Sequence, residues 1–266
     1  MNAKRLALGW VFFLAGAVLL SPLFISKSAY DMNFSHALEA PSFSHLFGTD
    51  SLGRDLLSRV LLGSSVSLGV SLCAVFLALA VGTWIGAVAA YKGGLWDKTL
   101  MAFVDTMLCF PVFFLMLSVL AVLGPNVWSI PCVIGLTSWM GVARLVRSEV
   151  LSIKEREFIL AARVMRARSF WIITRHLIPN VRERVLVSGI LGISAAILAE
   201  AGLSFLGIGI QPPAPSWGNI LMDAKATLGA AWWLLFFPGA MIFLTVLSMN
   251  ILGEHWTQNE KNHSSD

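Results

Sequence analysis

Four charged side chains are gathered in one short polar segment, GTDSLGRDLLSR, between two apolar stretches. Asp50, Arg54, Asp55 and Arg59 stand at local spacings that allow ion pairs. A carboxylate at position 50 can also accept backbone N–H groups and cap the helix that follows. The sequence offers no set of nucleophile, base and orienting residue, so catalysis is not indicated. We expect either a structural elbow before an apolar span or a surface for a partner.

Metal and nucleotide chemistry find little support in the sequence. Its three cysteines, Cys73, Cys109 and Cys132, lie in or beside apolar runs without the spacing of metal ligands, which indicates structural thiols. The chain contains no G-x-x-x-x-G-K-[ST] phosphate loop. Energy for any transport must therefore come from a partner or from an ion gradient.

Composition indicates a protein that crosses a membrane several times. Of its 266 residues, 57% are hydrophobic and 13% are charged, whereas a soluble domain has about 25% charged residues. No polar region is long enough for a separate soluble domain, so residues 1–266 are expected to form one membrane domain. The net charge of +4 does not indicate nucleic-acid binding, because the basic residues cluster between apolar runs.

Six apolar segments have about the 20 residues that a spanning helix needs. They are Leu6–Ser26, Val66–Tyr91, Thr99–Leu123, Val127–Val146, Val185–Ile208 and Ala230–Gly253. The first follows two basic residues, as a signal peptide would. Its apolar run is long and no convincing cleavage site follows, so an uncleaved anchor is expected.

The distribution of Lys and Arg predicts the orientation. With the N-terminus inside, only four of the 19 basic residues fall outside, namely Lys27, Arg54, Arg59 and Lys225. Both termini, including the tail 254–266, are therefore predicted to be cytoplasmic. The segment 27–65 and a Pro-rich loop, GIQPPAPSWGNILMDAKATLG, would be external. Prolines at 212, 213 and 215 oppose a regular helix in that loop, so a compact loop or re-entrant cap is expected.

The most basic element is the cytoplasmic segment 148–184, which contains FILAARVMRARSFWIITRHLIP. Its apolar residues recur at spacings of three and four, as on one helical face, and Pro179 is expected to end or kink the helix. One interpretation is an interfacial helix held by anionic lipid of the membrane. The other is a docking element for a cytoplasmic partner, which the adjacent small residues Ala161 and Ala162 favour.

This segment resembles the coupling-helix motif of bacterial ABC-importer permeases, which reads E-A-A, three residues, G, nine residues, I-x-L-P. Ala161, Ala162 and Pro179 match that motif. Leu160, Arg166 and His176 stand where the motif has glutamate, glycine and isoleucine. The resemblance implies that this segment contacts an ATPase, through the following residues: Leu160, Ala161, Ala162, Arg163, Arg166, Arg168 and Pro179. We expect Arg166 to contact the ATPase directly.

Two further stretches extend the resemblance to nearly the whole chain. HLFGTDSLGRDLLSRVLLGSSVSLG is similar to a signature of the peptide/nickel branch of these permeases, and EAGLSFLGIGIQPPAPSWGNIL is similar to its fifth-span and external-loop signature. The chain most resembles the C-type permease of such an importer. The implied fold is an all-α membrane protein of the type I importer class, with six transmembrane helices and a cytoplasmic coupling helix.

The resemblance also implies the partners, the location and the substrates. The chain would sit in the bacterial inner membrane, pair with a second permease as a heterodimer, and bind two ATPase subunits that carry the ATP. An extracytoplasmic binding protein would deliver nickel, a metal chelate or short peptides. The short N-terminus and the phrase EFILAAR favour nickel or a chelate. No cofactor would be bound directly, and the chain would not itself be an enzyme.

Two acids inside predicted spans carry a functional expectation, because a buried charge is costly in hydrocarbon. Asp105 and Glu200 are each expected to face the bundle interior, where they would either line the translocation path or make a helix–helix hydrogen bond. Contact with the binding protein is assigned to four external residues: Asp50, Arg54, Asp55 and Trp217.

Two other classes of function remain open at this point. A secondary transporter driven by an ion gradient would need more intramembrane acids and an internal repeat. A membrane-anchored scaffold would need no residues facing a pore.

Overall fold

The computed structural model describes residues 2–24, 29–227 and 229–263, and all regular structure in these ranges is helical. The helices are α1 (Asn2–Phe24), α2 (Leu56–Lys92), α3 (Gly94–Leu108), α4 (Val112–Leu123), α5 (Ser129–Ile153), α6 (Glu157–Val164), α7 (Ser169–Ile172), α8 (Ile178–Phe205), α9 (Trp217–Lys225) and α10 (Trp233–His263). A short 3-10 helix (Phe34–His36) and a π-helical turn, η2 (Ile173–Leu177), complete the set. The all-α class is confirmed.

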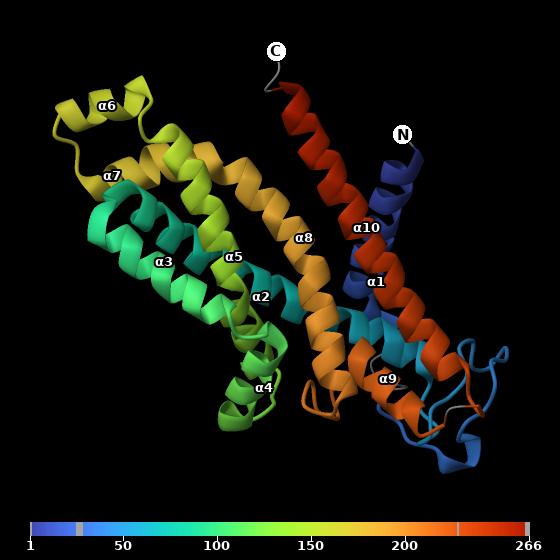
Figure 1. Ribbon diagram of the computed structural model, residues 1–266. Helices are drawn as coiled ribbons and strands as arrows, with labels where there is room; N and C mark the ends of the chain where they lie inside the picture. Colours follow the sequence, from blue (N-terminus) through green and yellow to red (C-terminus); the bar gives the residue numbers. More distant parts are fainter. Residues whose placement is uncertain (1, 25–28, 228, 264–266) are drawn as a thin grey trace.

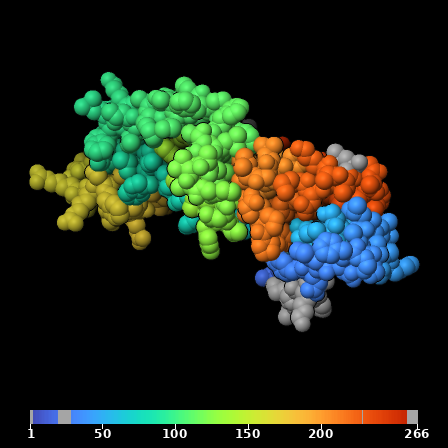
Figure 2. All heavy atoms as spheres, turned by 90° about the horizontal axis from the view of Figure 1, so that it is seen from below, coloured from blue at the N-terminus to red at the C-terminus, as the bar shows by residue number. Residues whose placement is uncertain are grey.

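The long helices run between two polar ends of the molecule. Helices α6 and α7, the start of α1 and the end of α10 lie at one end, and α9 with the segment 29–55 lies at the other (Figure 1). Seen from below, the segment 29–55 rests against the region of α8 and α9, while α4 forms a neighbouring part of the same end (Figure 2). The coupling segment 148–184 and the segment 29–55 therefore lie at opposite ends of the molecule. We call the end with α9 and residues 29–55 the external end, after the orientation that the charge pattern predicts; that orientation stays a prediction.

Within the described ranges, four helices are long and apolar enough to cross a membrane, and a bent pair adds a fifth if the pair is counted as one span. The four are α2, α5, α10 and one continuous helix, Ser169–Phe205, that joins α7, η2 and α8. They correspond to the second, fourth, sixth and fifth predicted spans. The first predicted span is helical as α1, but it is not among the five, and the last residues of that prediction lie outside the described ranges.

The third predicted span, Thr99–Leu123, is wrong as a single helix. Helices α3 and α4 meet at an angle of 90°. Pro111 is the N-cap residue of α4, and proline cannot donate the backbone hydrogen bond that would continue α3. The bend places α4 at the end of the molecule that carries α9 (Figure 1).

Helices α2 and α5 form the most extensive helix pair, and glycines set how closely they approach. A Cβ atom added at Gly82 would lie 2.6 Å from the Trp139 carbonyl oxygen and 2.6 Å from Val142 Cβ. Gly69, on the same helix, has no neighbouring atom within 4 Å of such a Cβ. The two glycines therefore differ only in whether another helix covers them.

Gly82→Ala should destabilise the chain although alanine is the better helix former. Overpacking a tight contact typically costs about 1–3 kcal/mol. Gly69→Ala is the matched control and should be neutral or stabilising by about 0.5–1 kcal/mol. Thermal unfolding of the two purified variants in detergent measures the difference, and equal melting temperatures would contradict the packing described above.

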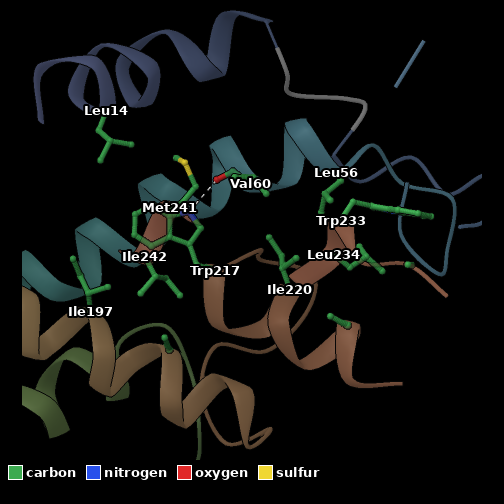
Figure 3. Packing of buried hydrophobic residues seen from close by; sticks show 13 residues of the cluster. Leu14, Leu56, Val60, Ile197, Trp217, Ile220, Trp233, Leu234, Met241 and Ile242 are labelled. Atoms are coloured by element: carbon green, nitrogen blue, oxygen red, sulfur yellow. Dashed lines mark hydrogen bonds between the residues drawn. The ribbon is translucent and has the colours of Figure 1, made fainter. Parts of the chain in front are cut away.

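The core at the opposite end fastens α9 to the spanning helices. Trp217 and Ile220 of α9 pack against Val60 of α2, Ile197 of α8 and Leu234 of α10 in one buried cluster (Figure 3). These residues come from four elements that are distant in the sequence. The cluster therefore holds the external end of the molecule in a fixed shape.

Candidate functional site

The segment with the coupling-helix pattern forms a corner of two helices. Helix α6 ends at Val164, a turn of four residues follows, and Ser169 begins the long helix that continues to Phe205. The chain turns at Arg166, whose φ of +53° lies in the left-handed region. Arg166 stands where the motif has glycine, and glycine is the residue that adopts this conformation without strain.

Pro179 was expected to end or kink the helix, and the predicted helix end is wrong; a kink there stays a prediction. Pro179 is the second residue of α8, and the helix passes through it from η2. The π-helical turn just before the proline gives the physical reason, because its wider hydrogen-bond pattern accommodates residues that an α-helix would exclude. Asn180 Nδ2 donates to the carbonyl oxygen of His176 at 2.6 Å, one turn back.

One face of this corner is fixed to the spanning helices. Ile159, Ala162, Ile173 and Leu177 are buried in one cluster with residues at the C-terminal ends of α2 and α5. Other members of the predicted apolar face are not buried, and Met165 is 82% exposed. Some residues of the predicted apolar face thus pack the corner against α2 and α5, and others lie on its outer surface.

The outer surface of the corner is an open groove of about 530 Å³ between α6 and α7. Its lining is mostly apolar: Phe158, Ala161, Ala162, Met165, Ala167, Arg168, Trp171 and His176. The His176 ring meets Trp171 edge to face, with centroids 4.7 Å apart, and its buried Nε2 has no hydrogen-bond partner among the described residues. Such a groove can receive an apolar side chain of another protein that also offers a polar atom to His176.

The predicted coupling residues divide between this groove and the surface around it. Ala161, Ala162 and Arg168 line the groove, whereas Leu160, Arg163, Arg166 and Pro179 are exposed outside it. The Arg163 guanidinium lies 4.9 Å from the ring centroid of Tyr91, at the end of α2. Sequence reasoning missed Phe158 and Trp171 as groove residues, although their aromatic character beside Ala161 was a usable signal.

Arg166→Gly should stabilise the corner. A non-glycine residue in the left-handed region carries a strain of about 1 kcal/mol that glycine avoids. Arg163→Gly is the control: it lies inside α6, where glycine should destabilise by about 1 kcal/mol. Hydrogen exchange of the amides in 157–168 measures both changes, and slower exchange in Arg163→Gly than in Arg166→Gly would contradict this account.

At the other end, a cluster of three buried charges and one half-buried charge holds the external segment to α9. Arg54 Nε donates to Asp50 Oδ2 at 2.6 Å, and Arg59 Nη1 donates to the same oxygen. Asp223 of α9 lies 3.2 Å from Arg59 Nη1 and 3.5 Å from Arg54 Nη2. Asp223 was not among the predicted site residues. Its acidic side chain in the external loop was the available signal.

The predicted helix cap is wrong, because Asp55 caps α2 in place of Asp50. Asp55 is the N-cap residue of α2 and accepts from Ser58 N at 2.9 Å. Asp50 instead accepts from the backbone N–H groups of Leu52 and Arg54, both at 2.9 Å, which closes the turn before the helix. Backbone N–H groups that follow in the chain can donate to either aspartate, so the sequence alone did not show which of the two caps α2.

Asp50 remains ionised at low pH. Burial alone would raise its pKa, but the Arg54 backbone N–H and the charges of Arg59 and Arg54 act against burial and hold the pKa of Asp50 below its usual value. The group therefore contributes stability above the ordinary carboxylate pKa, and this contribution is lost as pH falls through the lower, folded value.

The stability that Asp50 contributes should consequently decline only below about pH 4, which is the ordinary range of the aspartate pKa. Asp50→Asn should remove the part of this acid dependence that Asp50 supplies. Melting temperatures of both proteins between pH 3 and pH 7 test the sign, and an unchanged acid limb in Asp50→Asn would contradict it.

The Pro-rich loop forms a turn followed directly by a helix. Ser216 caps α9 by accepting from Asn219 N at 3.1 Å, and Asn219 Oδ1 accepts from Ser216 N at 2.9 Å. The prolines were expected to oppose a regular helix in this loop; that is wrong for residues 217–225, because α9 begins at Trp217, two residues after Pro215. Trp217 is fully buried, and its Nε1 donates to the Val60 carbonyl oxygen and to Ser64 Oγ.

The residues that were predicted to contact the binding protein are mostly buried. Asp50, Arg54 and Trp217 are buried in this structure, and the Asp55 side chain is 15% exposed. They form the framework of the external end and do not present a surface themselves. Their contact with a binding protein stays a prediction.

The two predicted intramembrane acids have different surroundings. Glu200 is fully buried and accepts from Ser67 Oγ at 2.9 Å and Ser204 Oγ at 2.7 Å, which joins α8 to α2. Asp105 does not face the interior of this chain. Its side chain is 58% exposed and accepts from Arg144 Nη2 of α5 at 2.5 Å. A place for either acid on the translocation path stays a prediction.

Known proteins are similar to this chain in sequence and in fold. The profile of the family described as "Binding-protein-dependent transport system inner membrane component" matches residues 82–259. The dipeptide transport system permease protein DppC of Alkalihalophilus pseudofirmus is 37% identical over 96% of this chain and 84% of its own length. The oligopeptide transport system permease protein OppC of Haemophilus influenzae is 37% identical over 89% of this chain and 77% of its own length.

A solved structure has the same fold at low sequence identity. A chain of the MetNI methionine ABC transporter, in an inward-facing conformation, superposes with a TM-score of 0.61. It shares 15% of residues and covers 76% of this chain, which in turn covers 95% of the MetNI chain.

Proposed function

This chain belongs to the family of binding-protein-dependent transport system inner membrane components, and we propose that it is the permease subunit of an ATP-driven importer through which short peptides enter the cell. Membership of that family makes it a transport subunit of the ABC importer class. The peptide substrate, the partners and the orientation form the proposal.

Peptides are favoured over nickel or metal chelates by the similar proteins. The relatives at 36–40% identity are described as permeases for dipeptides, oligopeptides, glutathione or peptides. The preference for nickel rests on one short phrase and the length of the N-terminus, and none of these relatives supports it. A secondary transporter driven by an ion gradient is likewise not favoured by these relatives.

The observation that carries the proposal is the corner formed by α6 and α7. It projects from the end of the molecule that carries most basic residues, and its inner face is packed on the ends of α2 and α5. Its outer face carries an open apolar groove beside the exposed cations Arg163, Arg166 and Arg168. A partner that binds this face would pull directly on two spanning helices.

The corner is also continuous with a third spanning helix. Because α7, η2 and α8 form one helix from Ser169 to Phe205, a displacement of α7 is passed to α8 without a flexible joint. In the proposed cycle, two ATPase subunits that close on ATP move the corner, and α2, α5 and α8 follow. Together with a second permease, this motion would expose the path alternately to the outside and to the cytoplasm.

The external end is a preformed platform in this proposal. A buried charge cluster and the core around Trp217 hold the segment 29–55 and α9 together. A binding protein that docks there meets a surface whose shape is set before it arrives, so less conformational entropy is lost on docking.

Uptake measurements test the proposed substrate. Deletion of the gene should abolish import of labelled dipeptides and tripeptides while leaving ⁶³Ni²⁺ uptake at its original level, and the reintroduced gene should restore peptide import. Loss of nickel uptake with intact peptide uptake would refute the peptide assignment and leave the importer class in place.

A further inference from the structure

A second groove, distinct from the corner, lies between α2 and α8. It has a volume of about 430 Å³ and is lined by Phe76, Leu79, Ala80, Thr83, Trp84, Ile178, Arg182, Val185 and Leu186. Phe76 and Leu186 are more than half exposed, so the groove opens on the side of the helix bundle. Its floor closes near Gly189, where an added Cβ would lie 2.8 Å from Leu79 Cδ1.

Two polar groups in this apolar groove have no partner within the part of the chain that the structure describes. Arg182 is exposed and makes no ion pair there. Thr83 is 9% exposed, and its Oγ1 is buried without a hydrogen bond. The hydroxyl can donate a hydrogen bond, and the guanidinium can pair with an anion. A ligand that suits this groove therefore has acceptor oxygens at one end and a hydrocarbon body that packs on the apolar walls.

The position of the groove gives its depth in the membrane. Ile178 and Arg182 begin α8, at the end of the molecule that carries α6 and α7 (Figure 1). The Trp84 ring lies near Phe170 of α7, with centroids 5.6 Å apart, as expected for a tryptophan at the membrane–water interface. From Trp84 to Phe76 the helix rises about 12 Å, which is close to the hydrocarbon depth of one leaflet, about 15 Å.

We propose that this groove binds an anionic phospholipid of the cytoplasmic leaflet. The phosphate would pair with Arg182, and one acyl chain would lie along Phe76, Val185 and Leu186. Rotation of the Thr83 side chain about χ1 would turn its buried Oγ1 toward the groove, where an ester carbonyl oxygen would accept from it. The assignment to that leaflet rests on the orientation in the proposed function. A lipid held here would bridge α2 and α8, two of the three helices that receive motion from the corner in the proposed function.

Native mass spectrometry of the full chain in detergent tests the site, with phosphatidylglycerol and phosphatidylcholine of identical acyl chains as probes. We expect phosphatidylglycerol to bind more tightly. Arg182→Gln should weaken its binding roughly five- to tenfold and leave phosphatidylcholine unchanged. Thr83→Val should weaken both lipids. Arg156→Gln, an exposed cation at the start of α6, is the control and should change neither.

Equal losses in Arg182→Gln and Arg156→Gln would indicate general surface attraction and overturn the proposal, as would equal affinity of the wild-type chain for the two lipids. Leu186→Trp should fill the groove and displace the lipid while a tagged second permease still co-purifies. Loss of that permease would instead make the groove a helix interface. None of these measurements involves ATPase or peptide, so their failure would leave the proposed transport function standing.

Discussion

Ala161→Trp should abolish ATP-driven peptide import and weaken binding of the ATPase subunits about hundredfold, in the range that central interface residues show. Ala161 is exposed and lines the groove of the corner, opposite Trp171 and His176. An indole there occupies the space that an ATPase side chain would enter. The substitution leaves the buried face of α6, with Ile159 and Ala162, unchanged.

Co-purification of the ATPase subunits with the tagged permease measures the effect, together with import into proteoliposomes. Ser152→Trp is the matched control, because Ser152 is exposed at the end of α5 and does not line the groove. It should keep both binding and import. If Ala161→Trp retained the ATPase subunits as well as Ser152→Trp does, the groove would not be the docking site.

Asp50→Asn should destabilise the external end by about 3–5 kcal/mol, the usual consequence of removing one member of a buried ion pair. Asparagine keeps the shape of the side chain and loses the charge that Arg54 and Arg59 share. Asp223 would remain as the only carboxylate beside two buried guanidinium groups in the described cluster. The turn before α2 would also weaken, since Asp50 accepts two of its backbone N–H groups.

Thermal unfolding followed by tryptophan fluorescence includes a signal from this end, because Trp217 and Trp233, two of the ten tryptophans, lie in its core. Asp31→Asn, on an exposed residue of the same external segment, is the control and should change the melting temperature little. Similar melting temperatures for Asp50→Asn and Asp31→Asn would show that the charge cluster is not needed for stability.

Apolar length and charge distribution were sufficient to predict most of the fold. The hydrophobic runs around Val66, Val127 and Ala230 became α2, α5 and α10, because about 20 apolar residues have few alternatives to a spanning helix. The bend between α3 and α4 escaped prediction. Pro111 lies within an otherwise continuous apolar run, and hydropathy does not register a lost backbone hydrogen bond.

Around the corner, sequence predicted the segment but not its geometry. Pro179 was expected to end or kink the helix, but the helix continues from η2 through Pro179, and the chain turns at Arg166 instead. Proline is a strong sequence signal for the end of a helix, whereas a π-helical turn and a positive φ at arginine have no comparable signal in the sequence. A helix–helix hydrogen bond was one of two roles expected for Glu200, but its partner Ser67 could not be predicted. The same holds for the pairing of Arg59 with Asp223, because both pairs depend on how the helices pack.

The central claim is that the outer surface of α6 contacts an ATPase. Photo-crosslinking from Leu160 tests it most directly, because this side chain is exposed on α6 and its replacement by p-benzoylphenylalanine leaves the buried face intact. In membranes that contain the whole importer, we expect a crosslink to an ATPase subunit that intensifies or weakens on addition of ATP. Crosslinks to lipid alone, with and without ATP, would contradict the claim and identify the corner as an interfacial membrane anchor.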